Sequence, residues 1–224
     1  MKKNWSKPTE LHLAPRPRKQ PRQRRSITLV RAIREACLRI LEHEGAEALT
    51  TNRIAEVAGV GVASVYQYFP NKDAILASVY EELLLREREA ITALFMDVAT
   101  KSSRDALESL IDHGIDSRRR LRAIAPDFYR KYHREFQLTP GGIAQGAGPD
   151  GLRSSMSSTG DMFAHFGATL RVANDTSAQF IFTRGIGAII DRAAEDAPTL
   201  LEDPAFRAAL KDMVARFLLL PDGG

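Results

Sequence analysis

The chain has one cysteine, Cys37, among its 224 residues, and this scarcity excludes several classes of protein. A single cysteine cannot form an internal disulfide or supply a thiolate metal cage. Cys37 falls on the apolar face of a predicted helix, so we expect a small core residue, with a redox-sensing thiol as the alternative. No metal and no cofactor are expected.

Long apolar runs are also missing. No stretch of 18 or more apolar residues occurs, so no transmembrane helix and no membrane partner are predicted. The first lysines are not followed by an apolar stretch, which argues against a secretory signal peptide, and we expect a cytoplasmic protein. The sequence also lacks a nucleophile–base pairing, a phosphate loop and a metal-ligand cluster, so an enzyme is not expected.

Positive charge is concentrated at the N-terminus. Residues 1–25 carry nine basic residues and one acidic residue, a net charge of +8, whereas the whole chain carries +4 and the remaining 199 residues therefore −4. Four prolines and few apolar residues predict that this arm is disordered or extended. A basic arm on a mildly acidic body is typical of a contact to a polyanion, and a solubilising tail is the equal alternative.

Beyond the arm, apolar residues recur at helical spacing almost to the end of the chain. The first predicted helix carries on one face Ile27, Val30, Ile33, Cys37, Ile40 and Leu41, and it stops near Gly45. A long helix is expected after Pro70, with Asn71 as its cap. Further helices are predicted over 103–124, 126–138, 152–171, 175–195 and 203–219. The predicted fold class is all-α.

The segment from Thr139 to Gly151 interrupts this pattern with five glycines and two prolines. It predicts a long connection between two helices, and a lid over a pocket is the alternative.

Two short helices separated by a glycine are predicted between Thr50 and Phe69. Thr50 or Thr51 can cap the first helix, and Gly59 allows the left-handed backbone of a sharp turn. The second helix should bury Val65 and Phe69 and direct outward Val62, Ala63, Ser64, Tyr66, Gln67 and Tyr68. Such a pair is a helix-turn-helix unit, whose second helix can enter the DNA major groove, although spacing alone fits an ordinary helical pair equally well.

The block from about Ile33 to Leu76 resembles the N-terminal domain of the TetR family of transcriptional regulators. The matching residues are Gly45, Thr50-Thr51, Ile54-Ala55, Ala58-Gly59-Val60, Val65-Tyr66-Gln67-Tyr68-Phe69, Asn71-Lys72 and Ile75-Leu76. The sequence departs from the family at Gly61, where a Ser or Thr is usual, and at Ala63, where many members have Gly. Both departures leave the operator sequence less defined.

The resemblance implies an N-terminal three-helix helix-turn-helix domain joined to a larger helical domain that binds a ligand and dimerises. The expected divisions are a basic arm over 1–25, a DNA-binding domain over 26–86, and an effector-binding and dimerisation domain over 87–224. The implied DNA contacts are Thr50, Thr51, Asn52, Arg53, Gly61, Val62, Ala63, Ser64, Tyr66, Gln67, Tyr68 and Lys72. The implied function is a dimeric repressor that binds a palindromic DNA operator and is released by a small-molecule effector. An enzyme with an incidental helical domain and a helical protein that binds another protein are the competing hypotheses.

The resemblance also places a homodimer interface in the last two long helices. The candidates are Phe182, Ile186, Ile189, Ile190, Phe206, Leu210, Met213 and Phe217, and core packing within one subunit is the alternative. The effector candidates are His113, Phe128, Tyr129, Tyr132, His133, Phe136, Met162, Phe163 and Phe166, for which plain core is again the alternative. The basic run Arg118-Arg119-Arg120 with Arg122 predicts a solvated helix face, and attraction of an acidic effector is the alternative.

Overall fold

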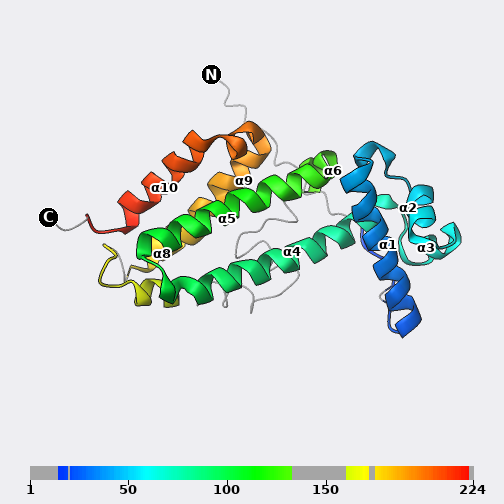
Figure 1. Cartoon of the computed structure of the whole chain (residues 1–224), viewed down its shortest axis with the longest axis horizontal. Coiled ribbons are helices and arrows are strands. Elements are labelled where there is room, and N and C mark those ends of the chain that lie inside the picture. Colours follow the sequence, from blue (N-terminus) through cyan, green and yellow to red (C-terminus); the bar gives the residue numbers. More distant parts are fainter. Residues whose placement is uncertain (1–14, 20, 133–159, 172–174, 222–224) are drawn as a thin grey trace, which may run out of the picture. The chain divides into compact units, whose positions relative to one another are not determined.

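The computed structural model describes residues 15–19, 21–132, 160–171 and 175–221, and within these ranges most of the chain is helical (Figure 1). The α-helices are α1 (Arg24–His43), α2 (Thr51–Ala58), α3 (Val62–Tyr68), α4 (Lys72–Met96), α5 (Ser103–Ile124), α6 (Pro126–Tyr132), α8 (Thr176–Phe180), α9 (Gly187–Asp196) and α10 (Pro204–Leu218). Short 3-10 helices are η1 (Ala46–Ala48), η2 (Asp97–Thr100) and η4 (Pro198–Glu202), and a π-helix, η3 (Ile181–Ile186), joins α8 to α9.

The all-α prediction is confirmed. The one β-type contact among the described residues is an isolated antiparallel bridge between Leu170 and Leu219. The helix predicted over 103–124 has those bounds, and the helix predicted over 175–195 is formed by α8, η3 and α9, with a π-helical segment at its centre. The segment from Thr139 to Gly151 lies outside the described residues. No helix in the described part of the chain is long and apolar enough to cross a membrane.

The chain forms two compact units, the first containing residues 1–79 and 127–136. In this unit α1 packs on α2 (Figure 1, blue and cyan), and its predicted apolar face is buried from Val30 to Leu41, whereas Ile27 in the first turn is 49% exposed. Cys37 is fully buried, and burial raises the pKa of its thiol to about 12. A thiol that stays protonated is a poor nucleophile, so Cys37 is the small core residue that the sequence predicts.

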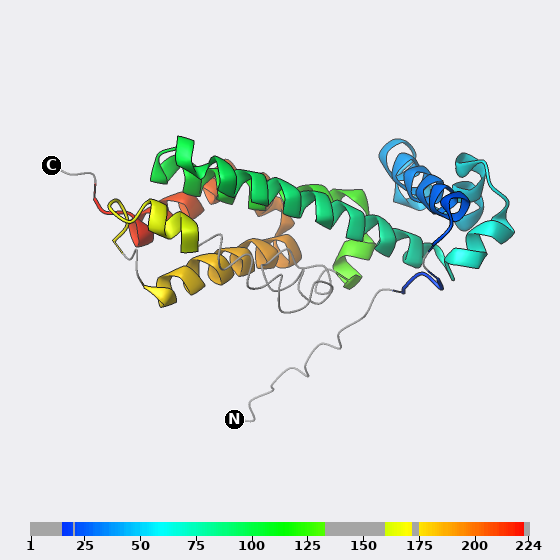
Figure 2. The same cartoon turned by 90° about the horizontal axis from the view of Figure 1, so that it is seen from below.

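The second unit contains residues 80–126 and 137–224. Its central helix, α5, packs beside α9 and α10 (Figures 1 and 2). Gly114 on α5 allows the close approach to α9, because a Cβ there would lie 3.1 Å from Cδ1 of Ile190. Acidic groups on the other side of α5 bind α10, since Arg207 donates to Asp112 (2.9 Å) and Asp116 (2.7 Å). The Arg207 hydrogen bond lowers the pKa of Asp116.

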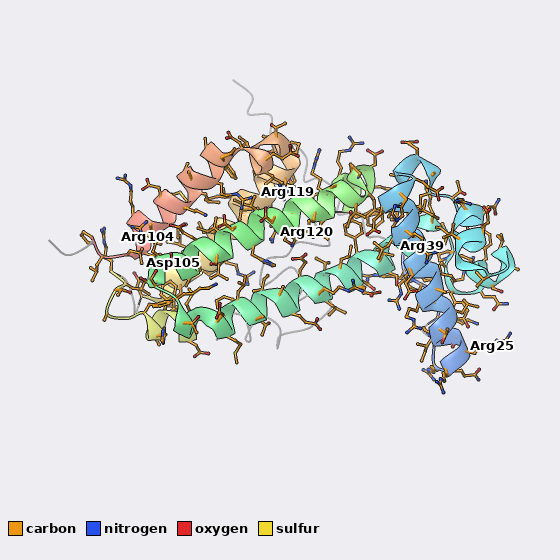
Figure 3. All side chains as sticks on the ribbon, in the orientation of Figure 1. Arg25, Arg39, Arg104, Asp105, Arg119 and Arg120 are labelled. Atoms are coloured by element: carbon orange, nitrogen blue, oxygen red, sulfur yellow. The ribbon has the colours of Figure 1, made fainter. Side chains whose placement is uncertain are left out.

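The basic run on α5 forms the predicted solvated face only in part. Arg118 is 4% exposed, and its Nε donates to Oδ1 of Asp191 on α9 over 2.8 Å. The side chain of Asp191 is buried too, so the two charges form an internal ion pair. Arg119 and Arg120 match the expectation, because both side chains are half-exposed on α5 (Figure 3), and Arg122 is partly exposed. The error has a simple cause: the carboxylate that draws Arg118 inward lies 73 residues away in sequence.

Candidate nucleic-acid interface

Local residues define both ends of the first helix of the predicted helix-turn-helix, α2. Oγ1 of Thr50 accepts from the amide of Arg53 at 3.1 Å, so Thr50 rather than Thr51 is the cap. At the other end Gly59 has φ +66°, and the amide of Val60 donates to the carbonyl of Ala55 at 3.0 Å. The left-handed turn at Gly59 therefore reverses the chain in the way that the sequence predicts.

The second helix, α3, presents a mostly accessible outer face. Val65 and Phe69 are buried at 0% and 1% exposure, whereas the phenol of Tyr66 is exposed. The accessible positions on α3 and at its start are Gly61, Val62, Ala63, Ser64, Tyr66 and Gln67. These residues are short or uncharged, so α3 can approach another surface closely but contributes no positive charge of its own.

Tyr68 departs from the predicted outward orientation. It is 9% exposed, because a segment of the N-terminal arm lies against it. The amide of Arg18 donates to the carbonyl of Tyr68 at 2.7 Å, and Nζ of Lys19 lies 4.7 Å from the centre of its ring. Because these partners are about 50 positions earlier in the chain, helical periodicity could not reveal them.

Arg53, a predicted phosphate ligand, is already paired with carboxylates. Its Nη2 and Nε donate to both oxygens of Glu44 at 2.8 and 3.0 Å, and Nη1 lies 2.8 Å from Glu56. The hydrogen bond from Arg53 lowers the pKa of Glu44. A DNA phosphate would have to compete with two carboxylates for this guanidinium. Arg53 therefore joins the end of α1 to α2 in the free protein.

Two polar residues, Asn71 and Lys72, lie at the start of α4. Oδ1 of Asn71 accepts from the amide of Ala74 at 2.9 Å, which confirms the predicted cap. Nζ of Lys72 donates to the carbonyl of Leu49 at 3.3 Å. A lysine has three donors, so Lys72 can keep this bond and still bind a phosphate. At the start of α2, Asn52 is exposed and Thr51 is half-buried.

Comparison with known proteins supports what this geometry suggests. Residues 33–79 match the model of the bacterial regulatory proteins of the tetR family. The chain carries a TetR-type helix-turn-helix domain. That match covers α2, α3 and their connecting turn, so the resemblance inferred from the sequence is confirmed. No curated protein matches the chain significantly.

Solved structures extend the similarity of fold to the larger part of the chain. SmeT, the repressor of the Stenotrophomonas maltophilia multidrug efflux pump SmeDEF, is 18% identical, with 87% of this chain and 91% of SmeT aligned and a TM-score of 0.53. A protein from Mesorhizobium loti assigned to the TetR-family transcriptional regulators is 17% identical, with 88% and 100% aligned and a TM-score of 0.52. A SmeT–triclosan complex aligns at 19% identity over 87% and 93%, with a TM-score of 0.50. The fold is thus TetR-like, with a larger helical C-terminal domain.

The predicted effector residues fall in different places. Phe128, Tyr129 and Tyr132 are buried in the first unit, where the hydroxyl of Tyr132 is 3.1 Å from Oδ2 of Asp73. In the second unit the buried candidates are Met162, Phe163 and Phe166. His133 and Phe136 lie outside the described residues.

His113 is the one polar candidate on α5, and it has a neighbour that the sequence did not suggest. Its Nε2 lies 3.2 Å from Oε2 of Glu87, but the contact is not aligned as a hydrogen bond. Burial lowers the pKa of His113, although Glu87 opposes the shift. One turn along α5, Ser117 is fully buried and its Oγ has no hydrogen-bond partner. A buried polar atom without a partner is unusual in a folded protein.

The predicted dimer residues split into two groups. Phe182, Ile190 and Leu210 are buried inside the subunit, so they have little surface to give to an interface. Ile186 and Phe206 are partly exposed. The exposed large apolar side chains of this region are Phe180, Ile181, Ile189, Met213, Phe217 and Leu220. Three of these, Phe180, Ile181 and Leu220, were not among the predicted residues.

Proposed function

We propose that the protein is a dimeric transcriptional repressor that binds a palindromic DNA operator and is released by a small-molecule effector. The observation that carries the proposal is the accessible face of α3, within a domain that matches the tetR family. The divisions proposed are an arm over 1–25, a DNA-binding domain over 26–86 and a helical domain over 87–224. Because bacterial genes are transcribed in the cytoplasm, the proposed location of this regulator is the cytoplasm.

Base recognition falls to the outer face of α3. Gln67 is exposed and can form two hydrogen bonds with an adenine edge in the major groove. Val62 and Ala63 can contact a thymine methyl group, and Ser64 can donate to a base edge. Because these side chains are short, the helix axis must come close to the floor of the groove. Gly61, without a side chain, leaves room at the start of the helix.

Phosphate contacts surround that face. The exposed hydroxyl of Tyr66 can donate to a phosphate, and Lys72 can do so beside its bond to Leu49. Thr50, Thr51 and Asn52 bring amides and polar side chains at the start of α2. We expect a smaller contribution from Arg53, because Glu44 and Glu56 already hold its guanidinium.

Substitutions on α3 test this assignment. With a fluorescein-labelled duplex from the region upstream of its own gene, Gln67→Ala should raise the Kd by the factor that corresponds to about 1–3 kcal/mol, roughly 5- to 150-fold. Tyr66→Ala and Lys72→Ala should weaken binding to all sequences alike. Leu85→Ala is the control, because Leu85 is exposed on α4 outside the recognition face. Equal Kd values for all four variants and the wild type would contradict the proposal.

A second copy of this chain is the proposed occupant of the apolar surface on α8–α10. Ile189 on α9 is 38% exposed, and Met213 and Phe217, one turn apart on α10, are 45% and 38% exposed. Exposed large apolar side chains that lie next to one another are typical of an interface. A twofold dimer also suits a palindrome, because it places two copies of α3 about one DNA turn apart. Light scattering should give twice the subunit mass for the wild type, and the subunit mass for Phe217→Glu. Leu85→Glu is the matched control and should remain dimeric. A monomeric wild type would contradict the interface.

The proposal of a small-molecule effector rests on two buried polar atoms in the second unit that have no hydrogen-bond partner. His113 Nε2 and Ser117 Oγ lack hydrogen-bond partners, and a small molecule with a polar group could supply them. SmeT forms a complex with triclosan, so a panel of small aromatic compounds that includes triclosan is a suitable screen. A true effector should raise the Tm of the wild type, release DNA, and lose affinity in Ser117→Ala. If no compound did all three, the proposal would lose its support.

A further inference from the structure

The N-terminal arm contributes a defined contact to the recognition helix. Residues 15–19 run past the C-terminal end of α3, where the amide of Arg18 donates to the carbonyl of Tyr68. Lys19 lies over the ring of the same tyrosine, with Nζ 4.7 Å from the ring centre. A solubilising tail has no need of either contact.

The contact has a physical reason at the helix end. The last carbonyls of a helix have no partner within the helix and must find one elsewhere. In α3 the carbonyl of Val65 accepts from Phe69, which is the next residue after the helix, and the carbonyl of Tyr68 accepts from Arg18. The arm therefore caps the recognition helix, and this hydrogen bond holds the backbone of Arg18 and Lys19 beside the end of α3.

The docked segment supplies charge that α3 lacks. No residue of α3 is basic, whereas the side chains of Arg16, Arg18 and Lys19 are all exposed. Cations near a helix C-terminus are favoured by the helix dipole, so this is a stable place for them. A phosphate that approached the end of α3 would meet two cations anchored through Tyr68.

We propose that Arg18 and Lys19, anchored by Tyr68, form a binding site for the phosphate backbone of DNA, beside the groove that α3 enters. The inference rests on the proposed function, because it needs α3 in the major groove. It differs from general attraction by a basic tail, because Arg18 and Lys19 have a defined position at the end of α3. The arm then contributes a fixed number of phosphate contacts in each subunit.

The salt dependence of DNA binding tests the site. The full-length protein is titrated onto a fluorescein-labelled duplex of about 30 base pairs from the region upstream of its own gene, between about 50 and 200 mM KCl. Loss of two phosphate contacts in Arg18→Gln/Lys19→Gln should reduce the slope of log K against log salt by about two per subunit. A dimer bound to both half-sites would lose about four contacts, so its loss of affinity across this salt range should be about a hundredfold smaller than in the wild type.

The matched control is Lys2→Gln/Lys3→Gln, which removes the same charge from the same arm. The site predicts a much smaller change of slope for this variant. Equal changes in the two double variants would overturn the site and favour a diffuse electrostatic effect. An unchanged slope in Arg18→Gln/Lys19→Gln, with normal binding by the wild type, would overturn the site alone. If the wild type did not bind DNA, the proposed function would fail as well.

Hydrogen exchange tests the docking without DNA. Because the amide of Arg18 is bonded to Tyr68, it should exchange at least about tenfold more slowly than an unstructured amide. The Lys19→Gln variant should keep this protection, since the bond is made by the backbone of Arg18. Exchange of the Arg18 amide at the unstructured rate in the wild type would overturn the docked arm.

Discussion

Breaking the internal ion pair between α5 and α9 should destabilise the second unit severely. Arg118 and Asp191 meet at 2.8 Å, and their side chains are 5% and 9% exposed. In Asp191→Ala the guanidinium would stay buried without its carboxylate. Removing one partner of a buried ion pair typically costs about 3–5 kcal/mol, because the remaining charge has lost its water and gained nothing in return.

The same reasoning predicts that an apolar pair can replace Arg118 and Asp191. In Arg118→Met/Asp191→Leu both charges go and apolar groups of similar volume remain, so the free energy of unfolding should lie within about 1–2 kcal/mol of the wild type. The double variant should therefore be more stable than Asp191→Ala alone. That order would show that the cost comes from the uncompensated charge.

Urea unfolding followed by circular dichroism measures these differences. With a slope of about 2.5 kcal/mol per molar urea, a loss of about 4 kcal/mol moves the midpoint by about 1.6 M. The control is Glu82→Ala, which breaks the exposed Glu82–Arg86 pair on α4 and should cost less than about 1 kcal/mol. All variants are compared at one protein concentration, because dimer formation would add to apparent stability. A loss in Asp191→Ala no larger than in Glu82→Ala would refute the reasoning.

Three further predictions follow from single residues. Gly59→Ala should lower the free energy of unfolding by about 1–2 kcal/mol, because φ at Gly59 is +66° and an alanine there would strain the backbone. The space around Gly59 is open, so a steric clash adds nothing to this cost. An unchanged Tm would contradict this. Cys37 should resist a thiol reagent in the folded protein and react only after unfolding, since burial raises its pKa to about 12; rapid labelling of the native protein would disprove it. Burial lowers the pKa of His113 below 6.5, so the unfolded state takes up the proton first and stability should fall as the pH drops from about 7 to about 5. His113→Gln should lose less stability over that range, and an equal loss would count against the assignment.

The helix-turn-helix was predictable because its determinants are local. Thr50 caps the helix that follows it, Gly59 turns the chain where a left-handed backbone is needed, and Asn71 caps α4 three residues from its partner. In each case the residue acts within one helical turn of its own position. Sequence spacing can therefore reveal the element and most of its orientation.

The errors arose where a partner lies far along the chain. Tyr68 occupies an outward position by helical period, yet the arm covers it. Arg118 belongs to a basic run, yet Asp191 draws it into the interior. Periodicity on α9 and α10 marks apolar positions, but it does not distinguish Ile190, which is buried in the subunit, from Ile189, which is exposed. Only the packed structure separates core from surface among apolar residues.

Footprinting of the DNA upstream of its own gene tests DNA recognition by α3 most directly. The wild type should protect two symmetry-related half-sites whose centres are about one helical turn, 34–36 Å, apart. Gln67→Ala should alter protection at specific base pairs within each half-site and leave the spacing unchanged. Protection of arbitrary sequences alike, or a footprint that Gln67→Ala and Tyr66→Ala leave unaltered, would contradict recognition by this helix.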